Sequence, residues 1–156
     1  MMLKTSSRPS RNLGLDLVRA TESAALAAGN WVGLGKALEA DRLATQSMMT
    51  TLNLVDIEAS FAFTEEAQTY ACAGVRSGQC VGTGDGPAMD LVIDAIDGRD
   101  LVAEGRPGAI AVMAVAPKGT LWSPKPAAYM EKIVVGPEAA DAIVPECLDA
   151  PAAWTL

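Results

Sequence analysis

The chain has 156 residues, half of them apolar, which fits a single domain of roughly 100–200 residues with a packed core and argues against general disorder. Its formal charge of −7 gives an acidic surface that repels phosphate backbones and anionic lipid, which argues against nucleic-acid and membrane partners. The absence of histidine excludes Ser-His-Asp triads, Cys-His pairs and His-ligated zinc, so acid–base or metal chemistry must come from carboxylates, hydroxyls, lysines or thiols.

The first eleven residues are polar and carry Lys4, Arg8 and Arg11 without an apolar run. Residues 1–11 are therefore predicted to be a flexible N-terminus and not a signal peptide. No segment of the chain approaches the roughly 18 apolar residues of a membrane span. The expected location is the cytoplasm.

Two helices are predicted next, because apolar residues recur at spacings of three and four. Ser10 is expected to cap the first helix, over about 12–31, and the glycines at 33 and 35 end it. The second helix fits about 38–55. The predicted inner stripes are Leu13, Leu17, Ala20, Ala24 and Ala28 in the first helix and Ala40, Leu43, Ala44, Met48, Leu52 and Val55 in the second.

Short apolar runs come after the helices and predict strands. The expected strands cover residues 60–64, 89–96, 109–116 and 129–135. Glycine-containing turn dipeptides close the last three of them. Helices first and strands later predict a layered α+β domain, with two N-terminal helices packed on a mixed sheet.

The tail carries weaker signals than the rest of the chain. A short helix fits about 138–144, and Pro145 and Pro151 prevent a regular helix beyond it. We therefore expect the domain to span 12–144 and residues 145–156 to form an irregular tail.

The three cysteines, Cys72, Cys80 and Cys147, lack CxxC spacing. An odd count of this kind gives neither a disulfide framework nor a zinc knuckle. A Cys72–Cys80 disulfide is the alternative, but free thiols are favoured because the low cysteine content fits a reducing compartment.

The segment from Asp90 to Gly98 places three aspartates in an otherwise apolar strand. Asp90 and Asp94 are four residues apart and therefore share a face of the strand. A regular strand would send Asp97 to the other face, but a bend at the Asp97-Gly98 turn is expected to return its carboxylate to Asp94. These two carboxylates and the Ile96 carbonyl would then suit Mg²⁺ or Mn²⁺. A solvated strand end with an ordinary Asp-Gly turn is an equally open interpretation.

Other polar features indicate no function by themselves. The glycine-rich run Gly82–Gly86 has the composition of a dinucleotide-binding loop, but it precedes a strand and does not open a helix, so a simple turn is favoured. Nothing in the pattern distinguishes Glu65, Glu66 or Asp41 from ordinary solvent-exposed charges.

The Asp94-Ala-Ile-Asp97-Gly98 element resembles the Asp-Pro-(Ile/Leu)-(Asp/Glu)-Gly-Thr motif of the inositol-monophosphatase and fructose-bisphosphatase superfamily. Within that superfamily the chain resembles the amino-terminal half of class II fructose-1,6-bisphosphatases along nearly its whole length. Only residues 57–80 match poorly. The segments that carry the resemblance are residues 17–28 (LVRATESAALAA), 31–33 (WVG), 81–87 (VGTGDGP), 105–115 (GRPGAIAVMAV) and 129–137 (YMEKIVVGP).

This resemblance implies half of the layered sandwich fold of that superfamily and a metal-dependent phosphatase of carbohydrate metabolism, in gluconeogenesis or the Calvin cycle. It implies Mn²⁺ or Mg²⁺ as cofactor and fructose 1,6-bisphosphate, or sedoheptulose 1,7-bisphosphate, as substrate. Matching positions imply metal ligands at Asp41, Glu65, Asp94, the Ile96 carbonyl and Asp97, with Glu66 as the alternative to Glu65. They also imply substrate contacts from Gly98, Arg99 and Tyr129, with Asp94, Asp97 and Arg99 in the catalytic positions.

The chain also departs from the family pattern. The motif proline is Ala95, and the threonine that orients the attacking water is Arg99, which binds phosphate but has no hydroxyl. The Gly-Glu-Gly-Glu run of the family is replaced by residues 64–67 (TEEA). The family's chains are also much longer, and their further part supplies another metal-binding glutamate and the basic residues that grip the substrate.

These departures leave three hypotheses. The first is an active sugar-bisphosphate phosphatase. The second is a truncated, non-catalytic homologue that binds metal or phosphate, or that pairs with a full-length subunit. The third is a metal-free remnant in which Arg99 pairs with Asp94 or Asp97. An apolar sheet edge or face left uncovered predicts a homo-oligomer or such a mixed assembly.

Overall fold

The computed structural model describes residues 12–63, 75–122 and 135–138. The chain divides into two units, residues 1–123 and 124–156. In the second unit, Pro137 and Glu138 have a 3₁₀ conformation. All the helices and strands below belong to the first unit.

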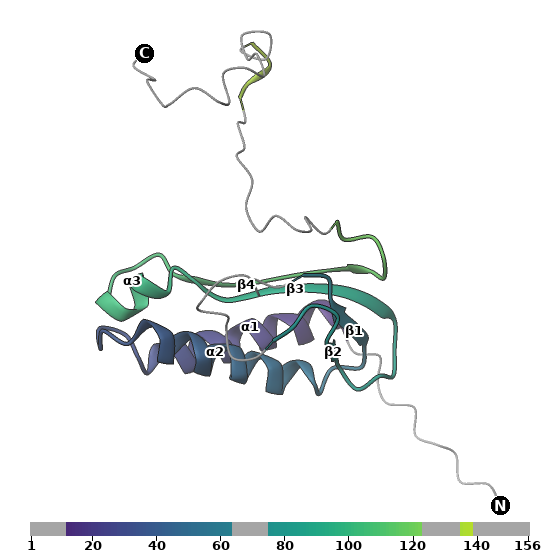
Figure 1. Cartoon of the computed structure of the whole chain (residues 1–156), viewed down its shortest axis with the longest axis horizontal. Helices are drawn as coiled ribbons and strands as arrows, with labels where there is room; N and C mark the ends of the chain where they lie inside the picture. Colours follow the sequence, from purple (N-terminus) through teal and green to yellow (C-terminus); the bar gives the residue numbers. More distant parts are fainter. Residues whose placement is uncertain (1–11, 64–74, 123–134, 139–156) are drawn as a thin grey trace, which may run out of the picture. The chain divides into compact units, whose positions relative to one another are not determined.

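Two antiparallel helices form one layer of the first unit (Figure 1). They are α1 (Leu13–Gly29) and α2 (Ala37–Leu52), so both predicted helices are confirmed, with ends that differ from the prediction by one to three residues. The cap of α1 is Asn12, whose side-chain oxygen accepts a hydrogen bond from the Leu15 amide at 3.4 Å. The prediction of Ser10 as the cap was wrong.

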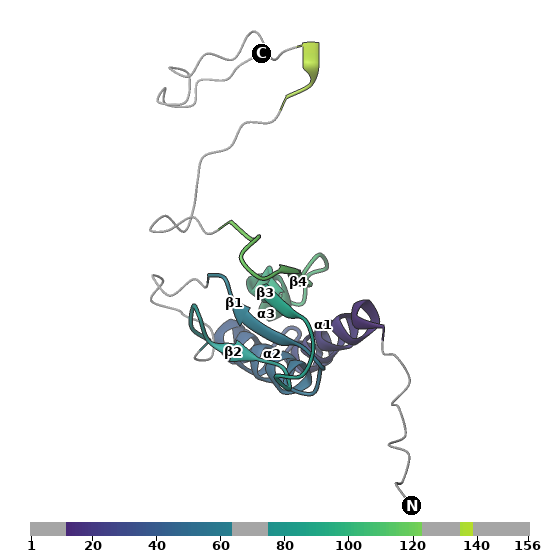
Figure 2. The same ribbon diagram turned by 90° about the vertical axis from the view of Figure 1, so that its right-hand side faces the viewer.

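A four-stranded sheet lies over the helices, with the order β2-β1-β3-β4 (Figures 1 and 2). β1 pairs with β3 in parallel, and the other two neighbouring pairs are antiparallel. The predicted α+β class, with two N-terminal helices on a mixed sheet, is confirmed. The strands are β1 (Glu58–Phe61), β2 (Cys80–Val81), β3 (Ala88–Asp97) and β4 (Ile110–Pro117), and a short helix, α3 (Arg99–Glu104), connects β3 to β4.

Some predicted elements differ from those observed. The strand predicted over 60–64 is wrong in its bounds, because β1 begins at Glu58 and ends at Phe61, where its pairing with β3 ends. β2 and α3 were not predicted, since two and six residues are too few to establish a hydrophobic period. The predicted strand over 129–135 and helix over 138–144 lie almost entirely outside the described residues, as does the predicted boundary at 144.

The core fills the space between the helices and the inner face of the sheet. Small residues of the predicted stripes, such as Ala24 and Ala44, are fully buried where α1 packs on α2, which allows a close approach of the two helices. A hydrogen bond between the Thr51 and Ser23 hydroxyls, 3.0 Å long, joins the helices at this contact. The largest fully buried side chains are Phe61, Met48, Leu52, Ile57 and Leu91.

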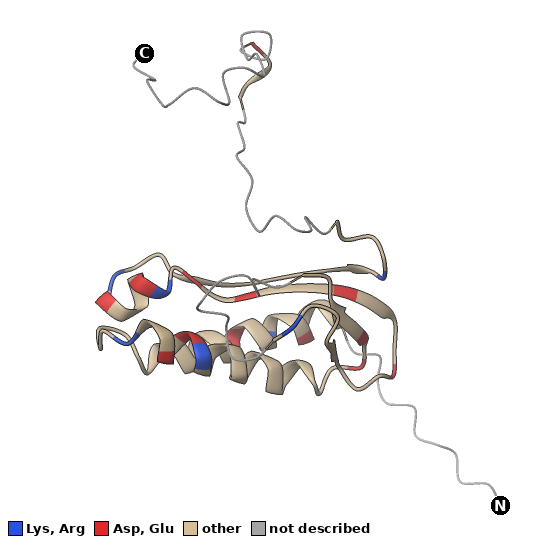
Figure 3. Cartoon of the chain, in the orientation of Figure 1, with Lys and Arg blue, Asp and Glu red and all other residues tan. Residues whose placement is uncertain are grey.

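Acidic side chains are spread over both the helices and the sheet (Figure 3). In the part of the chain that the structure describes, no helix combines the length and the apolar character needed to cross a membrane. The cytoplasmic location stays a prediction.

Candidate functional site

A β-bulge at the end of β3 brings Asp94 and Asp97 to the same face of the sheet. Asp94 is paired with Val112 and Asp97 with Ile110, so a step of three residues in β3 lies opposite a step of two in β4. The extra residue reverses the alternation of side chains, and Asp97 therefore returns to the face that Asp94 occupies. The expectation that both carboxylates lie on one side agrees with this geometry, but a bulge and not the Asp-Gly turn is the cause.

This face points away from the helices. Ala95 and Ile96, the two residues inside the bulge, are both buried, whereas Asp94 and Asp97 are exposed. The Ile96 amide donates a hydrogen bond of 3.1 Å to Oδ1 of Asp94, which fixes the orientation of that carboxylate. The two aspartates are thus presented to solvent from a rigid strand end.

The chain turns sharply after Asp97. Gly98 has φ +88°, a left-handed conformation that favours glycine, and a Cβ there would lie 3.0 Å from Cδ1 of Leu101. The turn leads directly into α3, whose first residue is the half-buried Arg99. Arg99 therefore follows Asp97 closely in the chain. It is one of the positions at which the resemblance implies a substrate contact.

Asp41 has a different environment. It lies in α2 and is only 3% exposed, and among the described residues no hydrogen bond or ion pair reaches its carboxylate. Thr45, one helical turn later, is 2% exposed, and its hydroxyl likewise has no partner in residues 12–63, 75–122 and 135–138. Buried polar oxygens without partners are costly. The donor set of this pair, a carboxylate and a hydroxyl, is one that fits a hard divalent cation.

The described carboxylates do not form a complete metal site. No three carboxylate or thiol side chains in residues 12–63, 75–122 and 135–138 lie close enough to hold a metal ion together. Asp41 belongs to the helical layer, whereas Asp94 and Asp97 lie on the far face of the sheet. Glu65, Glu66 and Tyr129 lie outside the described residues, so the predicted ligand and substrate-contact sets stay predictions.

An ion pair that no sequence pattern indicated joins the buried Asp90, near the start of β3, to the half-exposed Lys118. The Asp90 side chain is 7% exposed and lies 3.2 Å from Nζ of Lys118, which also contacts the Ser60 hydroxyl. Its Oδ2 accepts hydrogen bonds from the amides of Gly119 at 2.7 Å and Leu121 at 3.3 Å. Burial by itself raises the pKa of the Asp90 carboxyl, but the Lys118 ammonium and the two amides stabilise the charged form more strongly, so the pKa lies below its ordinary value.

Because Lys118 neutralises Asp90 and the two amides occupy its Oδ2, this aspartate anchors the turn after β4 and is not available to a ligand. The sequence could have suggested it only as an unpaired aspartate in an apolar strand. The partner is a lysine beyond the next helix and strand, which no local pattern connects to it.

A match to a known family decides where this chain belongs. The sequence model of the family described as bacterial fructose-1,6-bisphosphatase, glpX-encoded, matches residues 11–156. The chain belongs to this family. The resemblance to class II fructose-1,6-bisphosphatases is thereby confirmed.

Individual relatives agree with the family match. The chain is 40% identical over 129 residues to fructose-1,6-bisphosphatase 1 class 2 of Escherichia coli (strain K12), and equally to fructose-1,6-bisphosphatase class 2 of Shigella flexneri. The matched region is 83% of this chain but only 38% of each relative. This glpX-family chain thus spans well under half the length of these relatives.

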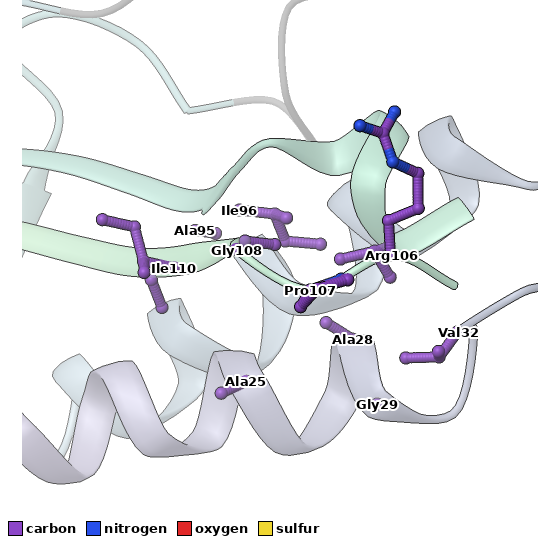
Figure 4. A pocket seen from close by; sticks show the side chains of 13 residues that line it. Ala25, Ala28, Gly29, Val32, Ala95, Ile96, Arg106, Pro107, Gly108 and Ile110 are labelled. Carbon is purple, nitrogen blue, oxygen red and sulfur yellow. The ribbon is translucent and has the colours of Figure 1, made fainter. Parts of the chain in front are cut away.

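A cavity of about 230 Å³ lies on the helix side of the sheet of this glpX-family chain, between α1 and the residues around α3 (Figure 4). Its walls are mostly small and apolar, among them Ala28, Ala95 and Ile110. The guanidinium of Arg106, the one charged lining residue, pairs with Glu104 at 3.0 Å and points away from the cavity (Figure 4). Because no carboxylate lines this cavity, it does not fit a metal ion.

Proposed function

We propose that this chain is a metal-dependent phosphatase that removes the 1-phosphate of a sugar bisphosphate. The proposed substrate is fructose 1,6-bisphosphate, with sedoheptulose 1,7-bisphosphate as the alternative. The observation that carries the proposal is the family match over residues 11–156, which includes the Asp94–Gly98 element. The proposed cofactor is Mn²⁺ or Mg²⁺.

The chemistry follows from the residues at the end of β3. Asp94 and Asp97 place two carboxylates on one exposed face of the sheet. Oxygen ligands of this kind suit Mg²⁺ and Mn²⁺. A bound divalent cation polarises the phosphoryl oxygens and lowers the pKa of the attacking water.

The remaining residues would bind and orient the substrate. Arg99, at the start of α3, carries a planar guanidinium that suits two-point binding of a phosphate. It lacks the hydroxyl with which the family's threonine orients the water. We therefore propose that the chain binds the phosphate well but positions the water poorly.

The experiment is phosphate release from fructose 1,6-bisphosphate with Mn²⁺ or Mg²⁺, measured for the wild type, Arg99→Thr and Asp94→Asn. The Arg99→Thr variant should release phosphate about tenfold faster than the wild type or more, because water orientation is restored. Asp94→Asn should abolish release, both alone and when combined with Arg99→Thr. Equal or lower activity of Arg99→Thr would contradict the assigned role of position 99.

The second candidate is a non-catalytic homologue that binds metal or phosphate. It is favoured by Arg99, which has no hydroxyl to orient the attacking water. It predicts no phosphate release from either the wild type or Arg99→Thr, together with saturable Mn²⁺ binding that Asp94→Asn removes.

We also propose that the chain associates with a second copy of itself or, alternatively, with a full-length subunit. α1 packs against β4, and both expose large apolar side chains, including Leu26 (76% exposed) and Ile110 (57% exposed). β4 is the last strand in the order of the described sheet. An apolar edge of this kind favours pairing with another polypeptide.

A further inference from the structure

Asp41 and Thr45 form a buried polar pair on α2. The family resemblance implies a metal-binding role for Asp41 but gives no role to Thr45. They are separated by four residues, and their side chains therefore lie on the same side of the helix, with Cβ atoms roughly 5–6 Å apart. Both are almost completely buried, and no hydrogen bond joins one to the other. The carboxylate and the hydroxyl are thus neighbours that do not satisfy each other.

The other hydroxyls of this helix behave differently. Thr50 donates a hydrogen bond of 2.8 Å to the Gln46 carbonyl, and Thr51 donates to the Ser47 carbonyl at 3.2 Å. Such bonds to the preceding turn are the usual solution for threonine in a helix. Thr45 makes no such bond in the described part of the chain, although it is the most deeply buried of the three. Its hydroxyl therefore remains available for a ligand.

The start of α2 is held rigidly, which keeps this pair in place. The amides of Gly33 and Gly35, just before α2, donate hydrogen bonds of 2.8 and 2.9 Å to the carbonyls of Val102 and Ala103 in α3. α2 also packs against β3. A preorganised pair of oxygens on a rigid helix is the arrangement that a bound ion requires.

We propose that the Thr45 hydroxyl and the Asp41 carboxylate together bind one divalent cation, with Thr45 as a ligand of that ion. A divalent cation is held by oxygen ligands at about 2.0–2.4 Å, and an ion bound here would satisfy both orphan oxygens at once. The inference rests on the proposed metal dependence of the chain, but it assigns to Thr45 a role that the family pattern does not contain.

The test is Mn²⁺ binding to the full chain, followed by the electron paramagnetic resonance signal of free Mn²⁺. Thr45→Val has nearly the same shape without the hydroxyl, and it should raise the Kd for Mn²⁺ about tenfold or more. Thr45→Ser restores the hydroxyl and should bind within a few-fold of the wild type. Thr50→Val is the matched control, because it makes the same change at an exposed threonine of the same helix.

A second readout, in metal-free protein, separates a ligand from a structural hydroxyl. Replacing an unpartnered buried hydroxyl by a methyl group should leave Tm unchanged or raise it by a few degrees. A threonine with a structural partner would instead lose stability on the same change. A fall in Tm of metal-free Thr45→Val, with Mn²⁺ affinity unchanged, would overturn the proposal.

The outcomes also separate this inference from the proposed function. If Thr45→Val binds Mn²⁺ like the wild type while Asp41→Asn or Asp94→Asn does not, Thr45 is not a ligand and the metal dependence stands. If the wild type binds no Mn²⁺ at all, both proposals fail.

Discussion

The glycine-rich run that invites a phosphate-binding interpretation has a structural role that can be tested directly. Gly82 has φ +99°, and a Cβ there would collide with the carbonyl oxygen of Ile57, the residue just before β1. Gly84, two residues on, has φ +83°, but a Cβ there would meet no heavy atom within 4 Å. Gly82→Ala and Gly84→Ala therefore share the backbone strain and differ in the collision.

The expected destabilisation follows from these contacts. Placing alanine in a left-handed conformation costs about 1–2 kcal/mol, which is the whole expected effect of Gly84→Ala. In Gly82→Ala the loop must also move away from Ile57. This movement stretches the bonds from the Thr83 amide to the Val55 carbonyl (2.9 Å) and from the Gly84 amide to the Ile57 carbonyl (3.1 Å). At about 1 kcal/mol for each bond, the total for Gly82→Ala is about 3–4 kcal/mol.

Urea unfolding of the two variants, followed by far-ultraviolet circular dichroism, measures the difference. With a slope of about 1–3 kcal/mol/M for a small domain, a difference of about 2 kcal/mol separates the two midpoints by about 1 M. Midpoints of Gly82→Ala and Gly84→Ala that coincide would refute the reasoning, since they would mean that the close approach to Ile57 contributes nothing.

Two further predictions concern Asp90 and association. Because the native pKa of Asp90 is lowered, its contribution to stability is complete above the unfolded value of about 3.9 and is lost as the pH falls through the native value. Asp90→Asn should therefore have a lower urea midpoint than the wild type at pH 7. The difference between the two midpoints should narrow under acid conditions, and a difference that stays constant with pH would contradict this ion-pair account. In sedimentation velocity the wild type should associate as its concentration rises, and the double variant Leu26→Glu/Ile110→Lys should associate less. A wild type that stays monomeric would contradict the assignment of this apolar surface as an interface.

The sequence predicted the helical layer well, because the pattern there is long and regular. Ala20, Ala24 and Ala28 of α1 repeat at one helical period, and each of them is buried as expected. β3 was also predictable, since its run of ten residues is strongly apolar apart from its aspartates. The two-residue β2 and the six-residue α3 could not be predicted, because their strand and helix states depend on their neighbours and not on their own composition.

The features of the candidate site likewise divide into those that the sequence predicts and those that depend on the tertiary structure. The sequence by itself identified the aspartates of β3 and placed the chain in its family, because the motif is short, ordered and local. Only the tertiary structure decided how they are used: a bulge against β4 turns Asp94 and Asp97 to one exposed face, while Lys118 neutralises Asp90. Burial likewise distinguishes Asp41 from an ordinary surface charge. The physical reason is that register, burial and ion pairing depend on residues far apart in the chain, which no local pattern contains.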